Sequence, residues 1–224
     1  MAVAITKENF FWHKLHSLSG IIPVGFYMLQ HLILNGFSLA GPDKYNSVSG
    51  FFYSMPPHIL WAIEIGVIWL PLLFHAIYGM FITSRGEMNS YFSSKYRWPQ
   101  ARMYTFQRYT GLFVFVFLCY HVTMTTVNVK LNGENAVNYA AMGQHLAQYG
   151  YLILVFYALG VFAASYHFCY GVWNFCIRWG ITISERAQNS IRKFSFGLFI
   201  VVTALGWLAL LGFFLHQADV TGVV

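Results

Sequence analysis

Long apolar runs alternate with short polar segments along the whole chain. The run over 66–82, GVIWLPLLFHAIYGMFI, contains no Asp, Glu, Lys or Arg. At about 1.5 Å per residue in a helix, about 20 such residues cross about 30 Å of hydrocarbon. The pattern therefore predicts one all-α, integral membrane domain over 1–224, a bundle of five transmembrane helices at about 15–35, 59–83, 106–127, 150–177 and 194–215.

The composition supports a membrane protein and excludes an ordinary soluble domain. Of the 224 residues, 58% are hydrophobic and only 9% are charged, whereas soluble domains carry about 25% charged residues. The three cysteines form no CxxC pair, so the sequence indicates neither a disulfide framework nor a covalently attached haem. The first residues lack the apolar core and cleavage site of a secretory signal, so we expect them to be retained.

The basic residues predict the orientation in the membrane. A net charge of +6 is compatible with nucleic acid binding, but all of the 13 Lys and Arg except Lys44 and Lys130 fall in the N-terminal segment or in the second and fourth loops. Because cytoplasmic loops are enriched in Lys and Arg, we expect the N-terminus on the cytoplasmic side of the bacterial inner membrane and the C-terminus outside. We expect no nucleic acid partner.

Each of the first four predicted spans contains one histidine within its apolar run. A titratable ring inside the membrane is costly to bury and usually has a partner or a ligand. Since successive spans alternate in direction, His31 and His121 should lie toward the outer face, and His75 and His167 in the cytoplasmic half. Neutral imidazole is a ligand of haem iron. The sequence predicts two haem b groups, an outer one on His31 and His121 and an inner one on His75 and His167.

A short repeat strengthens the haem interpretation. His75 is followed by Gly79 in HAIYG, and His167 by Gly171 in HFCYG. A glycine four residues after a histidine lies on the same helix face and leaves room for a flat macrocycle. The alternative is that both glycines serve close helix packing through small residues.

Glu64 is the acidic residue inside an apolar run. It precedes His75 by almost three helical turns, so it should share that face about 16 Å farther outward, at the depth of the outer haem. A carboxyl group there should be neutral or proton-exchanging, which makes Glu64 a candidate for proton transfer to a quinone. A structural acid near the start of the helix is the alternative.

Propionate groups on the inner haem would need cationic or hydroxyl partners. Four residues at the cytoplasmic ends of spans are candidates, namely His16, Ser17, Arg108 and Lys193. For Arg108 and Lys193 the alternative is ordinary anchoring at the membrane interface.

Four stretches, HKLHSLSGIIPVGFYMLQHL, EIGVIWLPLLFHAIYG, FQRYTG and HFCYGVWNFCIRWGIT, together resemble one family. They are similar to the cytochrome b anchor subunit of bacterial succinate:quinone oxidoreductases, in its five-helix, dihaem form. That form occurs with Bacillus-like succinate dehydrogenases and with epsilonproteobacterial fumarate reductases. The resemblance covers nearly the whole chain.

The resemblance implies an electron-transfer subunit with no catalytic residue of its own. The chain would dock a flavoprotein subunit with covalent FAD and an iron–sulfur subunit, and the dicarboxylate site would lie on these partners. Two haem b groups would connect the iron–sulfur clusters with a membrane quinone, expected to be menaquinone. The family's four axial ligands match His31, His75, His121 and His167, and its propionate-contacting pair matches His16 and Ser17.

Two alternative functions stay open at this point. A cytochrome b subunit of a formate dehydrogenase or hydrogenase also carries histidines in a membrane bundle, but one histidine in each of four spans favours the succinate or fumarate type. A non-haem transporter could use the histidines for metal or proton binding. Transporters often contain broken helices at mid-membrane, and here Pro23 and Pro71 could kink the first two spans without a long unwound segment.

Overall fold

The computed structural model describes residues 7–85 and 99–216. These residues form helices, turns and loops without a β-strand. Five helical stretches are long and apolar enough to cross a membrane, which confirms the predicted all-α fold with five spans. They are Phe10–Ala40, Pro57–Arg85, Ala101–Asn132, Tyr139–Arg178 and Glu185–Leu215.

Several of these spans are composite. The first comprises α1 (Lys7–Ser19), the π-helical segment η1 (Gly20–Gly25), α2 (Phe26–Asn35) and the 3-10 turn η2 (Gly36–Ala40). The second comprises α4 (Pro57–Ile63), π-helical η3 (Glu64–Trp69) and α5 (Leu70–Arg85), and the third comprises α6 (Pro99–Val122), π-helical η4 (Thr123–Val127) and α7 (Asn128–Asn132). The fourth is α8 (Tyr139–Arg178) and the fifth is α9 (Glu185–Leu215), while α3 (Pro42–Tyr53) and the 3-10 turn η5 (Glu134–Val137) connect spans at one end.

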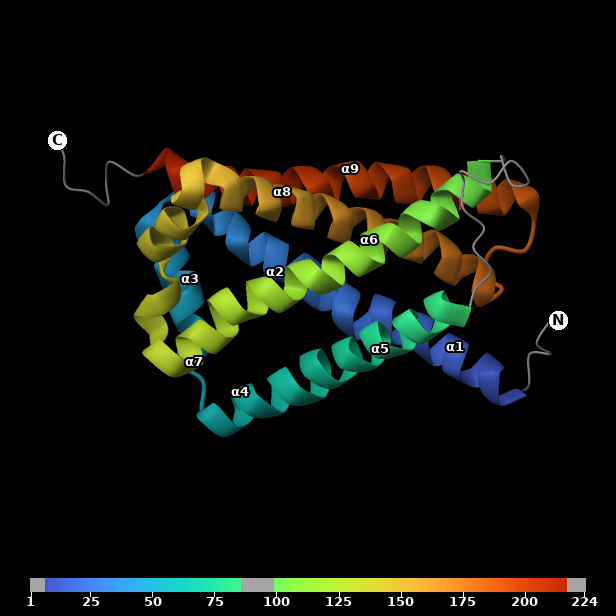
Figure 1. Ribbon diagram of the computed structural model, residues 1–224, viewed down its shortest axis with the longest axis horizontal. Coiled ribbons are helices and arrows are strands. Elements are labelled where there is room, and N and C mark those ends of the chain that lie inside the picture. Colours follow the sequence, from blue (N-terminus) through green and yellow to red (C-terminus); the bar gives the residue numbers. More distant parts are fainter. Residues whose placement is uncertain (1–6, 86–98, 217–224) are drawn as a thin grey trace.

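Successive spans run in opposite directions along the long axis of the bundle (Figure 1). Helices α8 and α9 pack side by side, α6 packs on α8, and α1 packs on α5 at the lower edge of the view. The starts of α1, α6 and α9 therefore lie at one end of the molecule, and α3 and α7 lie at the other. We call the end with α3 and α7 the outer end, following the orientation expected from the charges.

The fourth span contains a sharp break that the sequence pattern did not predict. Tyr149, Gly150 and Tyr151 have φ values of 52°, 63° and 69°, in the left-handed region that is unfavourable for residues with a Cβ. The break separates a short outer helix from the transmembrane part of α8. That part agrees with the predicted span over 150–177, whereas the outer helix and α3 were expected to be loops.

A hydrophobic core lies toward the outer end. Seven buried residues from α3, α6, α8 and α9 form a core of mostly aromatic side chains: Tyr45, Phe117, Tyr139, Met142, Leu146, Tyr157 and Phe213. By contrast, α4, η3 and α5 contain no buried residue. The second span is therefore held by fewer contacts than the fourth and fifth.

Close contact between η2 and α9 fixes the first span to the fifth. The Ser38 hydroxyl donates a hydrogen bond to the Ala209 carbonyl at 2.7 Å, and the Tyr139 hydroxyl donates to the Gly212 carbonyl. A Cβ at Gly212 would collide with Ser38 and would lie 2.7 Å from the Leu39 nitrogen. Small residues allow such approach in membrane bundles.

We predict that Gly212→Ala destabilises the protein by about 1–3 kcal/mol, the usual penalty for overpacking. The measurement is the melting temperature of the purified protein in detergent. Gly197→Ala in the same helix is the matched control, because nothing lies within 4 Å of its added Cβ. Equal melting temperatures for the two variants would contradict the close packing of η2 on α9.

Candidate functional site

The first pair of histidines lies toward the outer end. His31 projects from α2 and His121 from the last turn of α6, and their ring centroids are 5.7 Å apart with the ring planes at 80°. These are the two histidines that the sequence analysis placed at the same outer depth.

The second pair lies between α5 and α8. The ring centroids of His75 and His167 are 6.0 Å apart, and the ring planes are at 88°. The bundle thus brings the four histidines together as two separate pairs, contributed by four spans. Their role as iron ligands remains a prediction.

The spacing within each pair fits a shared metal centre. Two imidazole nitrogens that each bind one metal ion at about 2 Å place their ring centroids about 6 Å apart. Within residues 7–85 and 99–216, no group of three or more His, Cys, Asp or Glu could hold a metal ion. A pair of imidazoles is too few for a bare zinc ion, which takes four ligands, but suits haem iron, because the porphyrin supplies the other four nitrogens.

Backbone carbonyl groups fix both rings of the inner pair. The Nδ1 of His75 donates to the His16 carbonyl at 2.9 Å, and the Nδ1 of His167 donates to the Gln107 carbonyl at 3.1 Å. A carbonyl oxygen can only accept, so each Nδ1 carries the proton and each Nε2 keeps a free lone pair. This is the usual state of a metal-binding histidine whose other nitrogen is hydrogen-bonded.

Side chains, not carbonyl groups, contact the outer pair. The Asn35 amide donates to the His31 carbonyl at 2.8 Å and approaches the His31 Nε2 at 3.3 Å. The Tyr157 hydroxyl lies 3.4 Å from the Nδ1 of His121, and the Tyr45 hydroxyl lies 3.4 Å from the Asn35 oxygen. The sequence analysis missed these three residues, although Asn35 follows His31 by one helical turn.

His145 is another residue whose surroundings the sequence did not indicate. Its Nε2 lies 3.4 Å from the Tyr120 hydroxyl, and the centroid of its ring lies 5.8 Å from that of Tyr157. It therefore belongs to the polar group beside the outer pair.

Of the four propionate candidates, His16 lies directly against the inner pair. Its ring stacks on that of His75 with centroids 4.1 Å apart, and its buried Nδ1 has no hydrogen-bond partner among the described residues. His16 therefore has a hydrogen-bonding atom available for a bound group. Ser17 has a different role in the structure, because its hydroxyl donates to the Lys14 carbonyl at 2.9 Å and accepts from Trp179 Nε1 at 3.1 Å.

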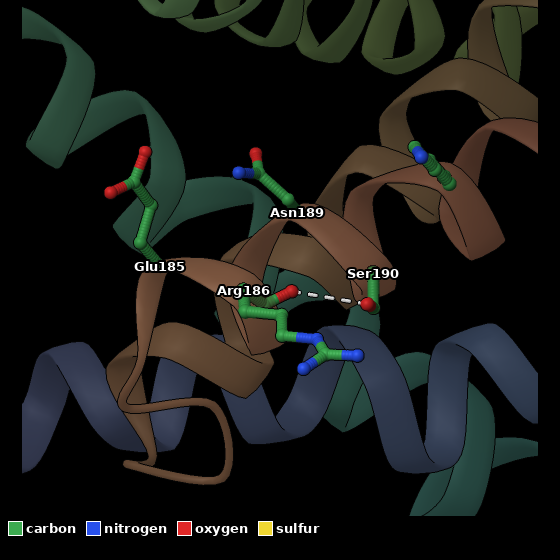
Figure 2. Close-up of a pocket in the computed structure, with 5 residues that line it drawn as sticks. Glu185, Arg186, Asn189 and Ser190 are labelled. Carbon is green, nitrogen blue, oxygen red and sulfur yellow. Dashed lines mark hydrogen bonds between the residues drawn. The ribbon is translucent and has the colours of Figure 1, made fainter.

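The two basic candidates lie farther from the histidines. The Arg108 guanidinium donates to the Thr83 carbonyl and lies 5.3 Å from the centroid of the Tyr104 ring, so it connects α6 with the end of α5. Lys193 is exposed and lines a shallow surface hollow at the start of α9. Figure 2 shows this hollow with Glu185, Arg186, Asn189 and Ser190 along one helix.

The glycines of the two HxxYG segments do not face the histidine rings that precede them. A Cβ at Gly79 would lie 3.1 Å from the His16 ring, and one at Gly171 would lie 3.8 Å from the Gln107 amide. The glycines that lie against the inner rings are Gly20 and Gly111, where an added Cβ would collide with His75 and His167. The sequence gave no reason to select Gly20 and Gly111, because each glycine lies on a different helix from the histidine that it contacts.

Glu64 has a partner that the sequence analysis did not identify. Its carboxylate forms a 2.6 Å ion pair with Lys130 of α7, and the Lys130 ammonium lies 5.0 Å from the centroid of the Trp61 ring. This ion pair places a positive charge directly beside a carboxyl group for which the sequence indicated no partner. It also joins the second and third spans near the outer end.

Comparison with known proteins gives two concordant results. A family model described as "Succinate dehydrogenase/Fumarate reductase transmembrane subunit" matches residues 88–218. The "Succinate dehydrogenase cytochrome b558 subunit" of Bacillus subtilis (strain 168) is 33% identical over 207 residues, which cover 92% of this chain and 98% of that protein.

We predict that the ion pair between Glu64 and Lys130 contributes less than about 1 kcal/mol, because exposed ion pairs are weak and 40% of the Lys130 side chain and 21% of that of Glu64 are exposed. A double-mutant cycle with Glu64→Gln and Lys130→Met, followed by thermal unfolding, measures the coupling. Lys44→Met is the matched control and should show no coupling to Glu64. A coupling of several kcal/mol would mean that the pair is shielded from water.

Proposed function

This chain belongs to the succinate dehydrogenase/fumarate reductase transmembrane-subunit family, and from that membership we propose that it is the dihaem cytochrome b anchor of a succinate:quinone oxidoreductase. The chain is a multi-pass membrane subunit of an oxidoreductase complex. Membership of this family excludes the two alternatives considered from the sequence, namely a formate dehydrogenase or hydrogenase subunit and a transporter.

The observation that carries the proposal is the arrangement of four histidines from four spans as two pairs with ring centroids about 6 Å apart. His31 and His121 would hold the outer haem b, and His75 and His167 the inner one. Haem b, when bound, supplies one-electron redox chemistry and would connect an iron–sulfur subunit with a membrane quinone.

The chain's own residues would orient and insulate these groups. The carbonyl groups of His16 and Gln107 hold the inner imidazoles with Nδ1 protonated, which increases the basicity of the ligating nitrogen. The unpartnered Nδ1 of His16 is suited to a propionate on the inner haem. Ser17 and Arg108 belong to α1 and α6, whose starts lie at the same end of the bundle. The apolar spans exclude water from the space between the pairs.

The partners would bind at the end opposite α3 and α7. We infer that this end faces the cytoplasm, since it carries most of the Lys and Arg. A flavoprotein subunit with FAD and an iron–sulfur subunit would dock there and hold the dicarboxylate site. The quinone, proposed to be menaquinone, would react within the membrane, with Glu64 as the candidate for proton transfer.

We predict that His31→Ala, His75→Ala, His121→Ala and His167→Ala each lower the haem content of the purified complex from two to one or none. Each change removes one of the two imidazoles that would hold one haem. The measurement is haem per complex from the reduced-minus-oxidised spectrum of the denatured haem with pyridine. His58→Ala is the control because His58 lies near the outer end of the second span, in neither pair. Two haems per complex in any of the four variants would refute the ligand set.

We predict that Glu64→Gln lowers quinone turnover by about 100-fold, a typical loss for a group that transfers protons, while both haems stay bound. The measurement is succinate-dependent quinone reduction together with haem content. Glu134→Gln, an exposed acid in η5, should leave turnover unchanged. Wild-type turnover in Glu64→Gln would show that the carboxylate serves the ion pair with Lys130 alone.

A further inference from the structure

The inner histidine of the second span sits in a cradle formed by the first span. The His75 ring donates from Nδ1 to the His16 carbonyl at 2.9 Å. One helical turn farther along, a Cβ at Gly20 would collide with the Cε1 of His75 and would lie 2.6 Å from its Nδ1. In return, Gly79, one turn after His75, lies against the His16 ring. His16 and Gly20 of the first span thus interlock with His75 and Gly79 of the second.

The inner histidine of the fourth span sits in an equivalent cradle formed by the third span. The His167 ring donates from Nδ1 to the Gln107 carbonyl at 3.1 Å. A Cβ at Gly111 would lie 2.8 Å from the Cε1 of His167 and 3.0 Å from its Nδ1. Gly171 lies one turn after His167. A Cβ at Gly171 would lie 3.8 Å from the Gln107 amide nitrogen.

The two cradles share their spacing as well as their contacts. The residue whose carbonyl accepts the hydrogen bond and the glycine are four residues apart in HSLSG (16–20) and in QRYTG (107–111). The histidine and its glycine are likewise four residues apart in HAIYG (75–79) and HFCYG (167–171). The same ring atoms face the glycine in both cases. We propose that spans one and two and spans three and four are two copies of one ligand-holding unit, in which Gln107 and Gly111 are the positioning residues of His167.

The two copies differ in the side chain at the carbonyl position. His16 stacks its ring on His75 with the ring planes at 11°, whereas the Gln107 amide donates to the His167 carbonyl at 3.0 Å. Gln107 therefore holds the ring and the backbone of His167 at the same time. The buried Oε1 of Gln107 and the buried Nδ1 of His16 both lack a hydrogen-bond partner among the described residues, a further property that the two positions share.

The cradle determines which way the inner ligands point. A ring that is bonded at Nδ1 and confined by a glycine at Cε1 has one orientation, and a side chain on the glycine would force it to move. The inference that this orientation serves iron ligation rests on the proposed function, but the packing itself does not.

The first test uses the glycines in the complex purified from membranes through a tag on this chain. Gly111→Ala and Gly20→Ala should each lower the melting temperature relative to Gly197→Ala, whose added Cβ has nothing within 4 Å. Each should also remove one haem, or shift the electron paramagnetic resonance signal of one low-spin haem, because that signal responds to the angle between the imidazole planes. The outer haem signal should stay as in the wild type.

The second test removes the Gln107 amide. Gln107→Leu should retain both haems but shift the resonance signal and the midpoint potential of the inner haem alone. Gln188→Leu is the matched control, because its amide also donates to a backbone carbonyl, that of Thr182 at 3.3 Å, but away from the pair. A shift confined to Gln107→Leu supports a positioning role, since a loss of general stability would affect both haems.

The outcomes separate this inference from the proposed function. A wild-type complex without two bis-histidine haems would refute the proposed function, and the melting temperatures of the glycine variants would still decide whether the cradles exist. If Gly111→Ala, Gly20→Ala and Gln107→Leu match their controls in melting temperature and in both haem signals, the repeated cradle is wrong.

Discussion

The structure depends on how imidazole rings are accommodated inside an apolar helix bundle. A buried ring has two polar nitrogens, and a membrane interior offers no water to satisfy them. In the inner pair a backbone carbonyl accepts the proton of one nitrogen, which leaves the other nitrogen of each ring available to a ligand. Because each ring needs such a carbonyl group, span one contacts span two at the depth of His75, and span three contacts span four at the depth of His167.

The bundle is unevenly packed. Helices α8 and α9 and the aromatic core at the outer end are closely packed, whereas the second span contains no buried residue. It contacts the first span through His75 at its inner half and the third span through Glu64 and Lys130 near the outer end.

The two pairs differ in chemistry although they share a geometry. Carbonyl groups hold the inner rings, and neutral side chains such as Asn35 and Tyr157 contact the outer ones. A carbonyl oxygen makes an imidazole more basic than a hydroxyl group at 3.4 Å does. A group bound through these imidazoles would therefore meet a different ligand basicity at each pair.

Sequence alone determined the number of the spans, their alternating direction and the relative depth of the four histidines, because apolar run length and helix rise are local properties. The family resemblance followed from the same local motifs. Only the tertiary structure decided which glycines meet which rings, because Gly20 and His75, like Gly111 and His167, lie on different helices and their contact depends on how those helices are rotated. The same reason applies to Lys130, whose partner Glu64 is on another span, and to α3, whose Tyr45 packs into the outer core.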